Sequence, residues 1–367
     1  MKIVIFGLTI SSSWGNGHAT LWRGLCKHLA RAGHSVVFFE RDVPYYAGAR
    51  DLHELPGGQL RLFSNWDDVL PLARSDIREA DVAIVTSYCP DAIAATELVL
   101  SEGRAVPVFY DLDTPVTLAK LIDGEAVPYI GPRGLRDFAL VLSFTGGSRI
   151  CNEFRDRLGA CNVRPLYGHV DTDIHRSVPS QPHYRADLSY LGTYSQDRQR
   201  ALEALFVEPA RNRQDRRFLI GGAQYPEDFP WSPNIYFVQH LPPSEHASFF
   251  ASSRLTLNVT RRAMAEMGWC PSGRLFEAAA CKAPLLSDDW PGLDAFFVPG
   301  QEILIARDAK DTLAALAMAD AELQHIAGRA YERTMDQHTS DKRAAELISL
   351  LEWTACFGAR RQQPEEA

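Results

Sequence analysis

The stretch IVIFGLTISSSWGNGHATLWRGLCKHLARAGHSVVFF, residues 3–39, predicts a parallel α/β fold. Residues 3–7 are a continuous apolar run with β-branched side chains, which is typical of a strand buried on both faces of a sheet. A loop of small residues leads into a predicted helix over 19–32, which Gly33 ends, and the apolar run 34–39 predicts the next strand. Because a strand, a helix and a strand follow one another, we expect two parallel strands joined by a right-handed crossover.

The same alternation continues along the chain and then starts a second time. Residues 168–186 show little periodicity, and residues 187–206 repeat the order of strand, glycine, small polar loop and helix. We therefore predict two Rossmann-like domains in tandem, over residues 1–168 and 187–335, with a linker over 169–186. Further strands are predicted at 82–87, 107–110, 140–144, 218–222, 235–238, 255–259, 284–287 and 302–305.

The composition limits the class of protein. A length of 367 residues suits two domains of roughly 100–200 residues each. The net charge of −8 disfavours non-specific binding to nucleic acid or anionic lipid, and no apolar run approaches the roughly 18 residues of a membrane helix. Seven cysteines without a CxxC pair predict reduced thiols in a cytoplasmic protein, and eleven histidines without HxxxH or HExxH spacing predict no metal site. We expect no bound cofactor.

The second predicted domain contains NVTRRAMAEMGWCPSGRLFEAAACKAPLLSDDWPGL, residues 258–293, in which a helix is expected to begin near Ser272 and Gly273. Free N–H groups at a helix start suit an anion, so Ser272, Gly273 and Arg274 are candidate ligands of a diphosphate. Glu277 lies three residues after Arg274 on the same helix face, and its carboxylate can accept hydrogen bonds from sugar hydroxyls. The plain structural alternatives are ordinary helix initiation with a solvated arginine, and a glutamate that the helix dipole favours.

Two motifs resemble those of GT-B glycosyltransferases in the broad GT4-like group. The run VDTD at 170–173 is similar to the linker motif GVDTDxF, with His169 and His175 in the places of its glycine and phenylalanine. The run RLFEAAAC at 274–281 is similar to the helix motif LEAMACG of the same group. This resemblance implies that Glu277 binds the ribose of a sugar nucleotide.

Further segments resemble the spore-maturation, CgeB-like glycosyltransferase family, so the resemblance covers nearly the whole chain. It implies two Rossmann-like domains facing across a cleft, and a last helix over 336–357 that packs back on the first domain. Two positions depart from the GT4-like pattern: Trp269 stands where an earlier glutamate is expected, and Lys282 replaces a glycine. Retaining chemistry is therefore not carried over. The CgeB-like segments are SSSWGNGHATLWRGL at 11–25, ERDVPYY at 40–46, YDLDTPVTLAKL at 110–121 and SFTGG at 143–147.

Other positions of the second domain are further candidate donor ligands. The turn Gly192, Thr193 and Tyr194 would let a phosphate or a sugar approach the backbone, although a tight turn gives the same pattern. Arg261, one of two adjacent arginines after a strand, is a rival phosphate ligand or a surface arginine. His240 follows another strand and is expected beside the nucleobase or in the core. A last set of candidate sugar ligands, or of turn residues, comprises Asp288, Asp289 and Trp290.

The acceptor and the catalytic base are expected in the first domain. Transfer to a hydroxyl group needs a base beside the attacking oxygen, and His18 suits that role because some inverting GT-B enzymes place a histidine there. Asp111 and Asp113, at a strand end, are alternative bases or acceptor ligands. A histidine with a structural hydrogen bond and a buried aspartate bonded to backbone N–H groups are the plain alternatives. The candidate acceptor-binding residues are Trp14, Gly15, Asn16 and Gly17.

Together these features predict a metal-independent GT-B glycosyltransferase that moves a sugar from a nucleotide-diphosphate sugar, its co-substrate, to an unknown hydroxyl-type acceptor. Two alternatives stay open. A nucleotide-sugar epimerase of the same fold would need no acceptor pocket. A non-catalytic nucleotide-sugar-binding protein would be consistent with Trp269 in place of the glutamate.

Overall fold

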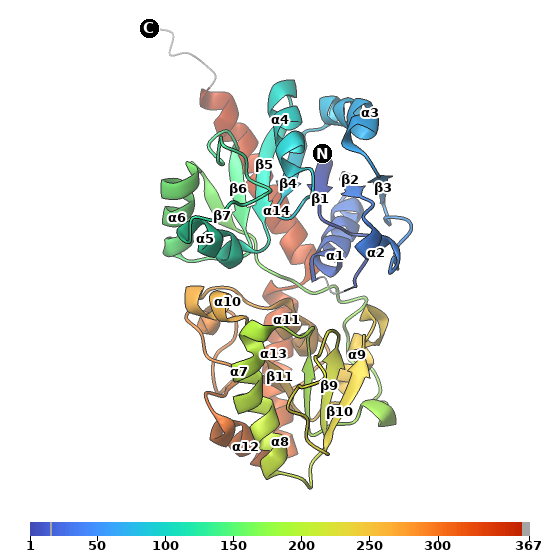
Figure 1. Ribbon diagram of the computed structural model, residues 1–367, viewed down its shortest axis with the longest axis vertical. Helices are drawn as coiled ribbons and strands as arrows, with labels where there is room; N and C mark the ends of the chain where they lie inside the picture. The colour runs from blue at the N-terminus through green and yellow to red at the C-terminus, as the bar shows by residue number, and fades with distance from the viewer. Residues whose placement is uncertain (15–16, 362–367) are drawn as a thin grey trace. The chain divides into compact units, whose positions relative to one another are not determined.

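The computed structural model describes residues 1–14 and 17–361, with side chains as far as residue 356 (Figure 1). Gly15 and Asn16, two of the predicted acceptor-binding residues, lie outside the described residues. The chain forms two compact units, which we call unit 1 and unit 2. Unit 1 consists of Met1–Tyr167 together with the chain from Ser340 onward, and unit 2 consists of Gly168–Thr339.

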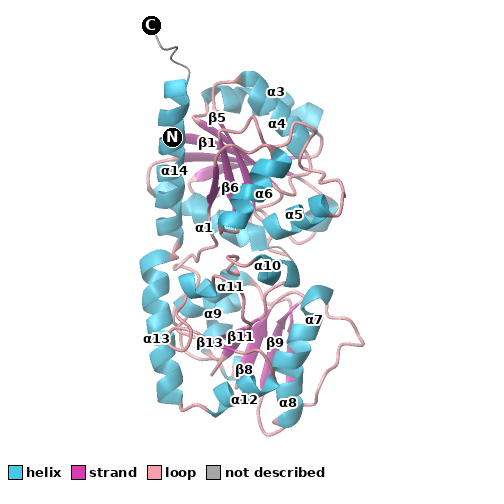
Figure 2. Ribbon diagram, turned by 90° about the vertical axis from the view of Figure 1, so that its left-hand side faces the viewer, coloured by secondary structure: helices cyan, strands magenta, loops and turns pink. Residues whose placement is uncertain are grey.

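Unit 1 is built on a seven-stranded parallel sheet in the order β3-β2-β1-β4-β5-β6-β7. This is the order of a doubly wound Rossmann sheet, in which the strand order reverses beside β1 and ligands bind at the carboxyl ends. The strands are β1 (Lys2–Gly7), β2 (Ser35–Arg41), β3 (Gly58–Phe63), β4 (Val82–Thr86), β5 (Val106–Asp111), β6 (Leu140–Ser143) and β7 (Val163–Pro165). The helices are α1 (Gly17–Arg31), α2 (Pro44–Ala47), α3 (Trp66–Glu79), α4 (Ala92–Glu102), α5 (Thr114–Ile122), α6 (Ser148–Leu158) and α14 (Ser340–Arg361), of which α14 packs against α1 (Figure 2).

Unit 2 repeats the same design with a six-stranded parallel sheet in the order β10-β9-β8-β11-β12-β13. Its strands are β8 (Leu188–Leu191), β9 (Phe218–Gly222), β10 (Ile235–Gln239), β11 (Thr256–Asn258), β12 (Leu285–Ser287) and β13 (Leu304–Ile305). Its helices are α7 (Gln196–Leu202), the π-helical turn η2 (Glu203–Val207), α8 (Glu208–Asn212), α9 (Pro243–Ala251), α10 (Arg262–Met267), α11 (Gly273–Ala280), α12 (Ala309–Ala317) and α13 (Asp320–Gln337), with 3-10 turns η1 (Pro182–Tyr184) and η3 (Leu293–Ala295). The predicted α/β class with two Rossmann-like domains is therefore confirmed.

Residues 169–186, which were predicted as a linker, cluster with unit 2. The Val170 N–H donates to the backbone oxygen of His338 at 2.9 Å, and the Tyr184 ring packs edge-on against Phe249 at 5.8 Å between centroids. His175 in the same segment is 4% exposed. These contacts are long-range in sequence, so the weak periodicity of the segment gave no sign of them.

The edge strand β3 and the preceding short helix α2 were not predicted. No residue of β3 is fully buried, and the strand lacks the continuous apolar run that marks the central strands. Residues 309–337 form two helices, since α12 ends before Met318 and α13 begins after Ala319. The core of unit 2 is made of wholly buried aliphatic and aromatic side chains, among them Leu188, Phe206, Phe218, Leu255 and Leu286.

Candidate active site

A buried carboxylate fixes the loop after β1, where the doubly wound sheet places a ligand crevice. Glu40, at the end of β2, is wholly buried and accepts four hydrogen bonds. The Thr9 and Ser11 hydroxyls donate at 2.8 and 2.5 Å, and the Ile10 and Ser11 N–H groups donate at 2.7 and 2.9 Å. Sequence reasoning did not assign Glu40 a role, although a charged residue directly after an apolar strand was a usable signal.

The structure brings the three predicted catalytic residues of unit 1 together. His18 Nε2 lies 2.7 Å from Asp113 Oδ2, and both side chains keep a small exposed surface of 14% and 17%. The Asp113 N–H in turn donates to Asp111 Oδ1 at 3.0 Å. A carboxylate that holds one imidazole nitrogen orients the ring and stabilises the imidazolium, which is the arrangement of a general base.

Asp111 differs from its two neighbours because it has no exposed surface. Burial raises the pKa of the Asp111 carboxyl to about 7. A group with no exposure does not reach an acceptor, so in this structure Asp111 supports the backbone of Asp113. Of the described acceptor candidates, Trp14 is half-buried and Gly17 is the exposed first residue of α1.

In unit 2 the helix α11 begins where the sequence predicted. Ser272 is the N-cap residue, and its Oγ accepts a hydrogen bond from the Arg274 N–H at 3.3 Å. Gly273 has open space on the side where a Cβ would lie, with no atom within 4 Å of that position. The first turn of α11 therefore presents N–H groups on a side that a ligand can approach.

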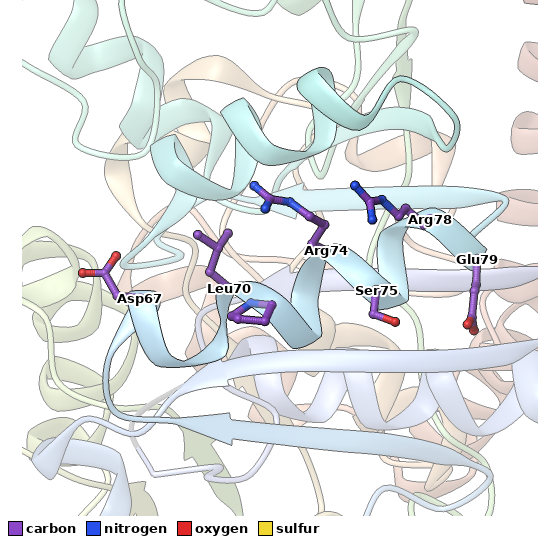
Figure 3. Close-up of a pocket in the computed structure, with 7 residues that line it drawn as sticks. Asp67, Leu70, Arg74, Ser75, Arg78 and Glu79 are labelled. Carbon is purple, nitrogen blue, oxygen red and sulfur yellow. The ribbon is translucent and has the colours of Figure 1, made fainter.

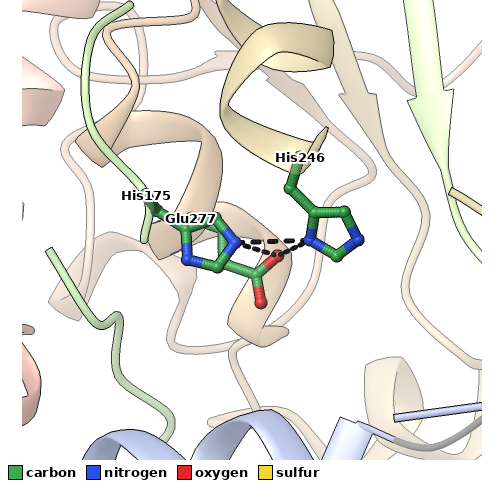
Figure 4. Close-up of side chains that lie close together, drawn as sticks. All are labelled: His175, His246 and Glu277. Atoms are coloured by element: carbon green, nitrogen blue, oxygen red, sulfur yellow. Dashed lines mark hydrogen bonds and ion pairs between the residues drawn. The ribbon is translucent and has the colours of Figure 1, made fainter. Parts of the chain in front are cut away.

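Glu277 lies one turn further along α11, at 6% exposure, inside a cluster of nitrogen-containing side chains (Figure 4). Its Oε2 contacts Arg274 Nη1 and lies 3.6 Å from both His175 Nε2 and His246 Nδ1. Burial alone would raise the pKa of Glu277, but the Arg274 guanidinium outweighs it and holds that pKa well below its ordinary value. Burial lowers the pKa of both imidazoles, that of His246 to about 4, so both rings are neutral at pH 7.

The remaining predicted donor ligands have partners within unit 2. Arg261 Nε bonds to Asp197 Oδ2 at 3.1 Å. The Thr193 backbone oxygen accepts from Arg198 Nη1 at 3.1 Å, and the Tyr194 ring packs on other aromatic rings. His240, with a left-handed φ of 48°, donates its N–H to the Gly222 oxygen at 2.7 Å.

The space beside Gly192 is taken up by protein. A Cβ at Gly192 would lie 2.6 Å from the Tyr190 hydroxyl, and a Cβ at Gly222 would lie 2.1 Å from the Gly192 backbone oxygen. The two glycines therefore let two chain segments pass closely, which is the tight-turn alternative for this motif.

The residues after β12, Asp288, Asp289 and Trp290, do not have the geometry of the predicted sugar ligands. Trp290 is 4% exposed, so its indole is not available to stack on a sugar ring. Asp288 accepts hydrogen bonds from the Thr260 N–H at 3.0 Å and the Thr260 hydroxyl at 2.9 Å, and burial raises its pKa to about 6. Asp289 pairs with Arg307 at 2.7 Å on the surface. Residues 288–290 thus form a turn that hydrogen bonds and an ion pair hold in place.

One surface hollow lies away from all these residues. It is lined by side chains of α3 alone, among them Leu70, Arg74 and Arg78, which point from a single helix (Figure 3). Side chains from one helix do not converge on a ligand from several sides, so the hollow has no feature of a substrate site.

Comparison with known proteins finds one matching family and several solved structures of the same fold. Residues 198–349 match the family described as glycosyl transferase-like. The sucrose-phosphate synthase of Thermosynechococcus elongatus superposes with a TM-score of 0.70 at 13% identity, covering 98% of this chain and 99% of that one. Anabaena HepE, solved in complex with UDP-glucose, gives 0.64 at 12% identity, covering 95% and 99%. The UDP-forming α,α-trehalose-phosphate synthase of Burkholderia xenovorans gives 0.62 at 13% identity, covering 96% and 99%.

No curated protein matches the chain by sequence. The family match covers most of unit 2 and the first part of α14. The fold is shared with these solved sugar-transferring enzymes over nearly the whole length. Over the described part of the chain, no helix has both the length and the apolar character needed to cross a membrane.

Proposed function

We propose that this chain transfers a sugar from a nucleotide-diphosphate sugar, bound by unit 2, to a hydroxyl group of an acceptor bound by unit 1. The observation that carries the proposal is the hydrogen bonding and the ionisation of Glu277. Among the residues that the structure describes, every polar contact of this carboxylate goes to Oε2. Oε1 is thereby left to accept a hydrogen bond from a ribose hydroxyl, and the ionised state of the group makes that bond strong.

The diphosphate would bind at the start of α11. The N–H groups beside Ser272 and Gly273 and the guanidinium of Arg274 supply donors and positive charge for the departing group. These groups would stabilise the leaving diphosphate without a metal ion in the transfer step. HepE, a protein of the same fold, has been solved with UDP-glucose, which supports a nucleotide sugar as the donor.

The acceptor oxygen would attack the anomeric carbon while the bond from that carbon to the diphosphate breaks. His18 would take the acceptor proton, and Asp113, whose Oδ2 lies 2.7 Å from His18 Nε2, would stabilise the imidazolium. A base that acts on the acceptor favours a single displacement, which inverts the configuration of the anomeric carbon. The CgeB-like assignment is part of this proposal and is supported by the segments at 11–25, 40–46, 110–121 and 143–147.

The test begins with thermal unfolding of the full chain in the presence of UDP, GDP, ADP and dTDP. A nucleotide at about 100 times its Kd stabilises the protein by roughly 2.7 kcal/mol, which identifies the base. Sugars of that nucleotide are then incubated with the protein and with a panel of hydroxyl acceptors. Nucleotide release that depends on the acceptor supports transfer. Sugar inversion without an acceptor would instead establish an epimerase, and saturable binding without turnover would establish a binding protein.

A further inference from the structure

We propose that His175, His246 and Glu277 form a binding site for one zinc-class divalent ion in unit 2, for which the Arg274 guanidinium competes. The three ligand atoms lie within 4.8 Å of one another and all three side chains are buried (Figure 4). The inference rests on this geometry, and it uses Glu277 and Arg274, which the proposed function assigns to the donor site.

The separations of the three atoms match those of a zinc coordination sphere. His175 Nε2 and His246 Nδ1 are 3.3 Å apart, and each lies 3.6 Å from Glu277 Oε2. The common centre of these atoms is therefore about 2.0 Å from each of them. Zinc binds imidazole nitrogen at about 2.0–2.1 Å and carboxylate oxygen at about 2.0–2.2 Å, so no side chain needs to move far.

The surroundings of the cluster hold the ligand atoms in place. His246 Nε2 lies 3.3 Å from the Leu241 backbone oxygen, and with the proton on Nε2 the lone pair of Nδ1 faces Glu277. Such an outer hydrogen bond to a carbonyl is the usual companion of a histidine that binds metal. The segment that carries His175 is fixed by the hydrogen bond from its N–H to the Asp171 backbone oxygen at 2.9 Å.

The chemical types of the three ligand atoms indicate which ion would bind. Two neutral imidazoles and one carboxylate suit zinc and the neighbouring late first-row metals. Calcium and magnesium prefer oxygen ligands, whereas two of the three ligand atoms here are imidazole nitrogens. Sequence reasoning predicted no metal site because His175, His246 and Glu277 come from three distant segments, and neither histidine has a partner at a metal-binding spacing.

Arg274 competes with the ion, so the site binds metal only when the guanidinium moves away. Its Nη1 lies 3.3 Å from His246 Nδ1 and contacts Glu277 Oε2, so the guanidinium stands beside the position that the ion would take. Two cations do not share this space, and the ion must therefore displace the guanidinium. The Arg274 side chain is 33% exposed, so solvent is within reach of a displaced guanidinium.

The experiment titrates Zn²⁺ into full-length, untagged, chelator-treated protein by calorimetry at pH 7.5. Cys161→Ser and Cys356→Ser are introduced throughout, because these two exposed thiols could bind zinc themselves. We expect one equivalent of Zn²⁺ per chain, at least tenfold weaker binding in His175→Gln and in His246→Gln, and no change in the exposed control His325→Gln. Replacement by Gln preserves most of the side-chain volume, and circular dichroism checks that each variant is folded.

Arg274→Gln separates metal binding from a simple hydrogen-bond network. Removal of the competing cation should tighten Zn²⁺ binding by roughly tenfold or more, whereas Mg²⁺ should not bind to any variant. Absence of saturable Zn²⁺ binding by the parent protein, equal binding by His246→Gln, or weaker binding by Arg274→Gln would each overturn the proposal. In that event the two imidazoles serve only to pack and orient Glu277. Donor binding and turnover are measured separately in chelator, so failure of this proposal and failure of sugar transfer are distinguishable.

Discussion

Two buried carboxyl groups, Asp111 in unit 1 and Glu277 in unit 2, respond to burial in opposite ways. Asp111 has no exposed surface and its pKa is raised to about 7, whereas Glu277, at 6% exposure, has a pKa held well below its ordinary value. The difference lies in the nearest charged neighbour, which is the carboxylate of Asp113 in one case and the guanidinium of Arg274 in the other. Burial raises the pKa of a carboxyl group, but the charge of the adjacent residue decides whether the final pKa lies above or below the ordinary value.

The two carboxyl groups also suit different functions, proton transfer near Asp111 and ligand binding at Glu277. Asp111, whose pKa is raised to about 7, supports the backbone beside the His18–Asp113 pair, where a proton has to be taken up. An ionised Glu277 suits the binding of hydroxyl groups. We therefore expect variants of the unit 1 cluster to change rate and variants of the unit 2 cluster to change affinity, and four experiments can break or sharpen this contrast.

The largest effect is expected for His18→Ala. Loss of a general base lowers turnover by roughly 10²- to 10⁴-fold, while the Kd for the nucleotide should not change because His18 lies in unit 1. Acceptor-dependent nucleotide release and nucleotide titration measure the two quantities, and the exposed His325→Ala serves as the control. Turnover equal to that of the parent protein would remove His18 from the mechanism.

The second effect is a dependence of stability on pH that Asp111 imposes. Its pKa rises from about 3.9 in the unfolded chain to about 7 in the folded one. Below about pH 4 both states are protonated and there is no penalty. The penalty grows as pH rises to about 7 and then stays constant, at on the order of 4 kcal/mol.

Asp111→Asn removes this ionisation. Relative to the parent protein, the variant should therefore gain stability between pH 5 and pH 8, in urea unfolding followed at both values. Asp68→Asn, at an exposed position of unit 1, is the matched control. A constant stability difference at the two pH values would show that Asp111 is ionised in the folded protein across this range, and the contrast with Glu277 would be lost.

The third effect is a weaker donor affinity in Glu277→Gln. A hydrogen bond to a charged group contributes about 1.5–3 kcal/mol, so the nucleotide Kd should rise roughly 10- to 100-fold. Calorimetric titration with the nucleotide chosen by the thermal screen measures it, and Glu266→Gln, exposed on α10, is the control. An unchanged Kd would mean that the donor binds elsewhere.

The smallest effect is expected at the helix cap that precedes Glu277. Ser272→Ala removes the acceptor for the Arg274 N–H and should destabilise unit 2 by about 1 kcal/mol, whereas Ser272→Gly should cost only a few tenths. Urea unfolding of both variants gives the two values. If the alanine and glycine variants are equally stable, the cap makes no contribution to the position of α11.

The parts of the molecule that could be predicted from the sequence are those that local patterns determine. Central strands such as β1 and β4 are continuous apolar runs, and the start of α11 is marked by Ser272 and Gly273. The edge strand β3 has no such run, because only part of its surface is buried. Local signals therefore predicted the α/β class with two Rossmann-like domains and one end of the candidate donor site.

Long-range contacts account for what the sequence did not reveal. His175 reaches Glu277 only because residues 169–186 belong to unit 2, and His246 arrives from α9. Glu40 meets the loop of Thr9 and Ser11 from a neighbouring strand. No periodicity links positions that are about 30 to 100 residues apart, so such clusters emerge only from the folded arrangement.

The membership of α14 in unit 1 has a consequence for the order of folding during synthesis. Unit 2 is one continuous segment, Gly168–Thr339, whereas unit 1 needs both Met1–Tyr167 and a helix that begins at Ser340. A ribosome releases the chain from its first residue onward, and domains fold as units once their residues have emerged. Unit 2 can therefore complete its core first, while the α1 surface that α14 covers stays open until α14 has emerged. A nascent chain held just after Thr339 should expose that surface to chaperones.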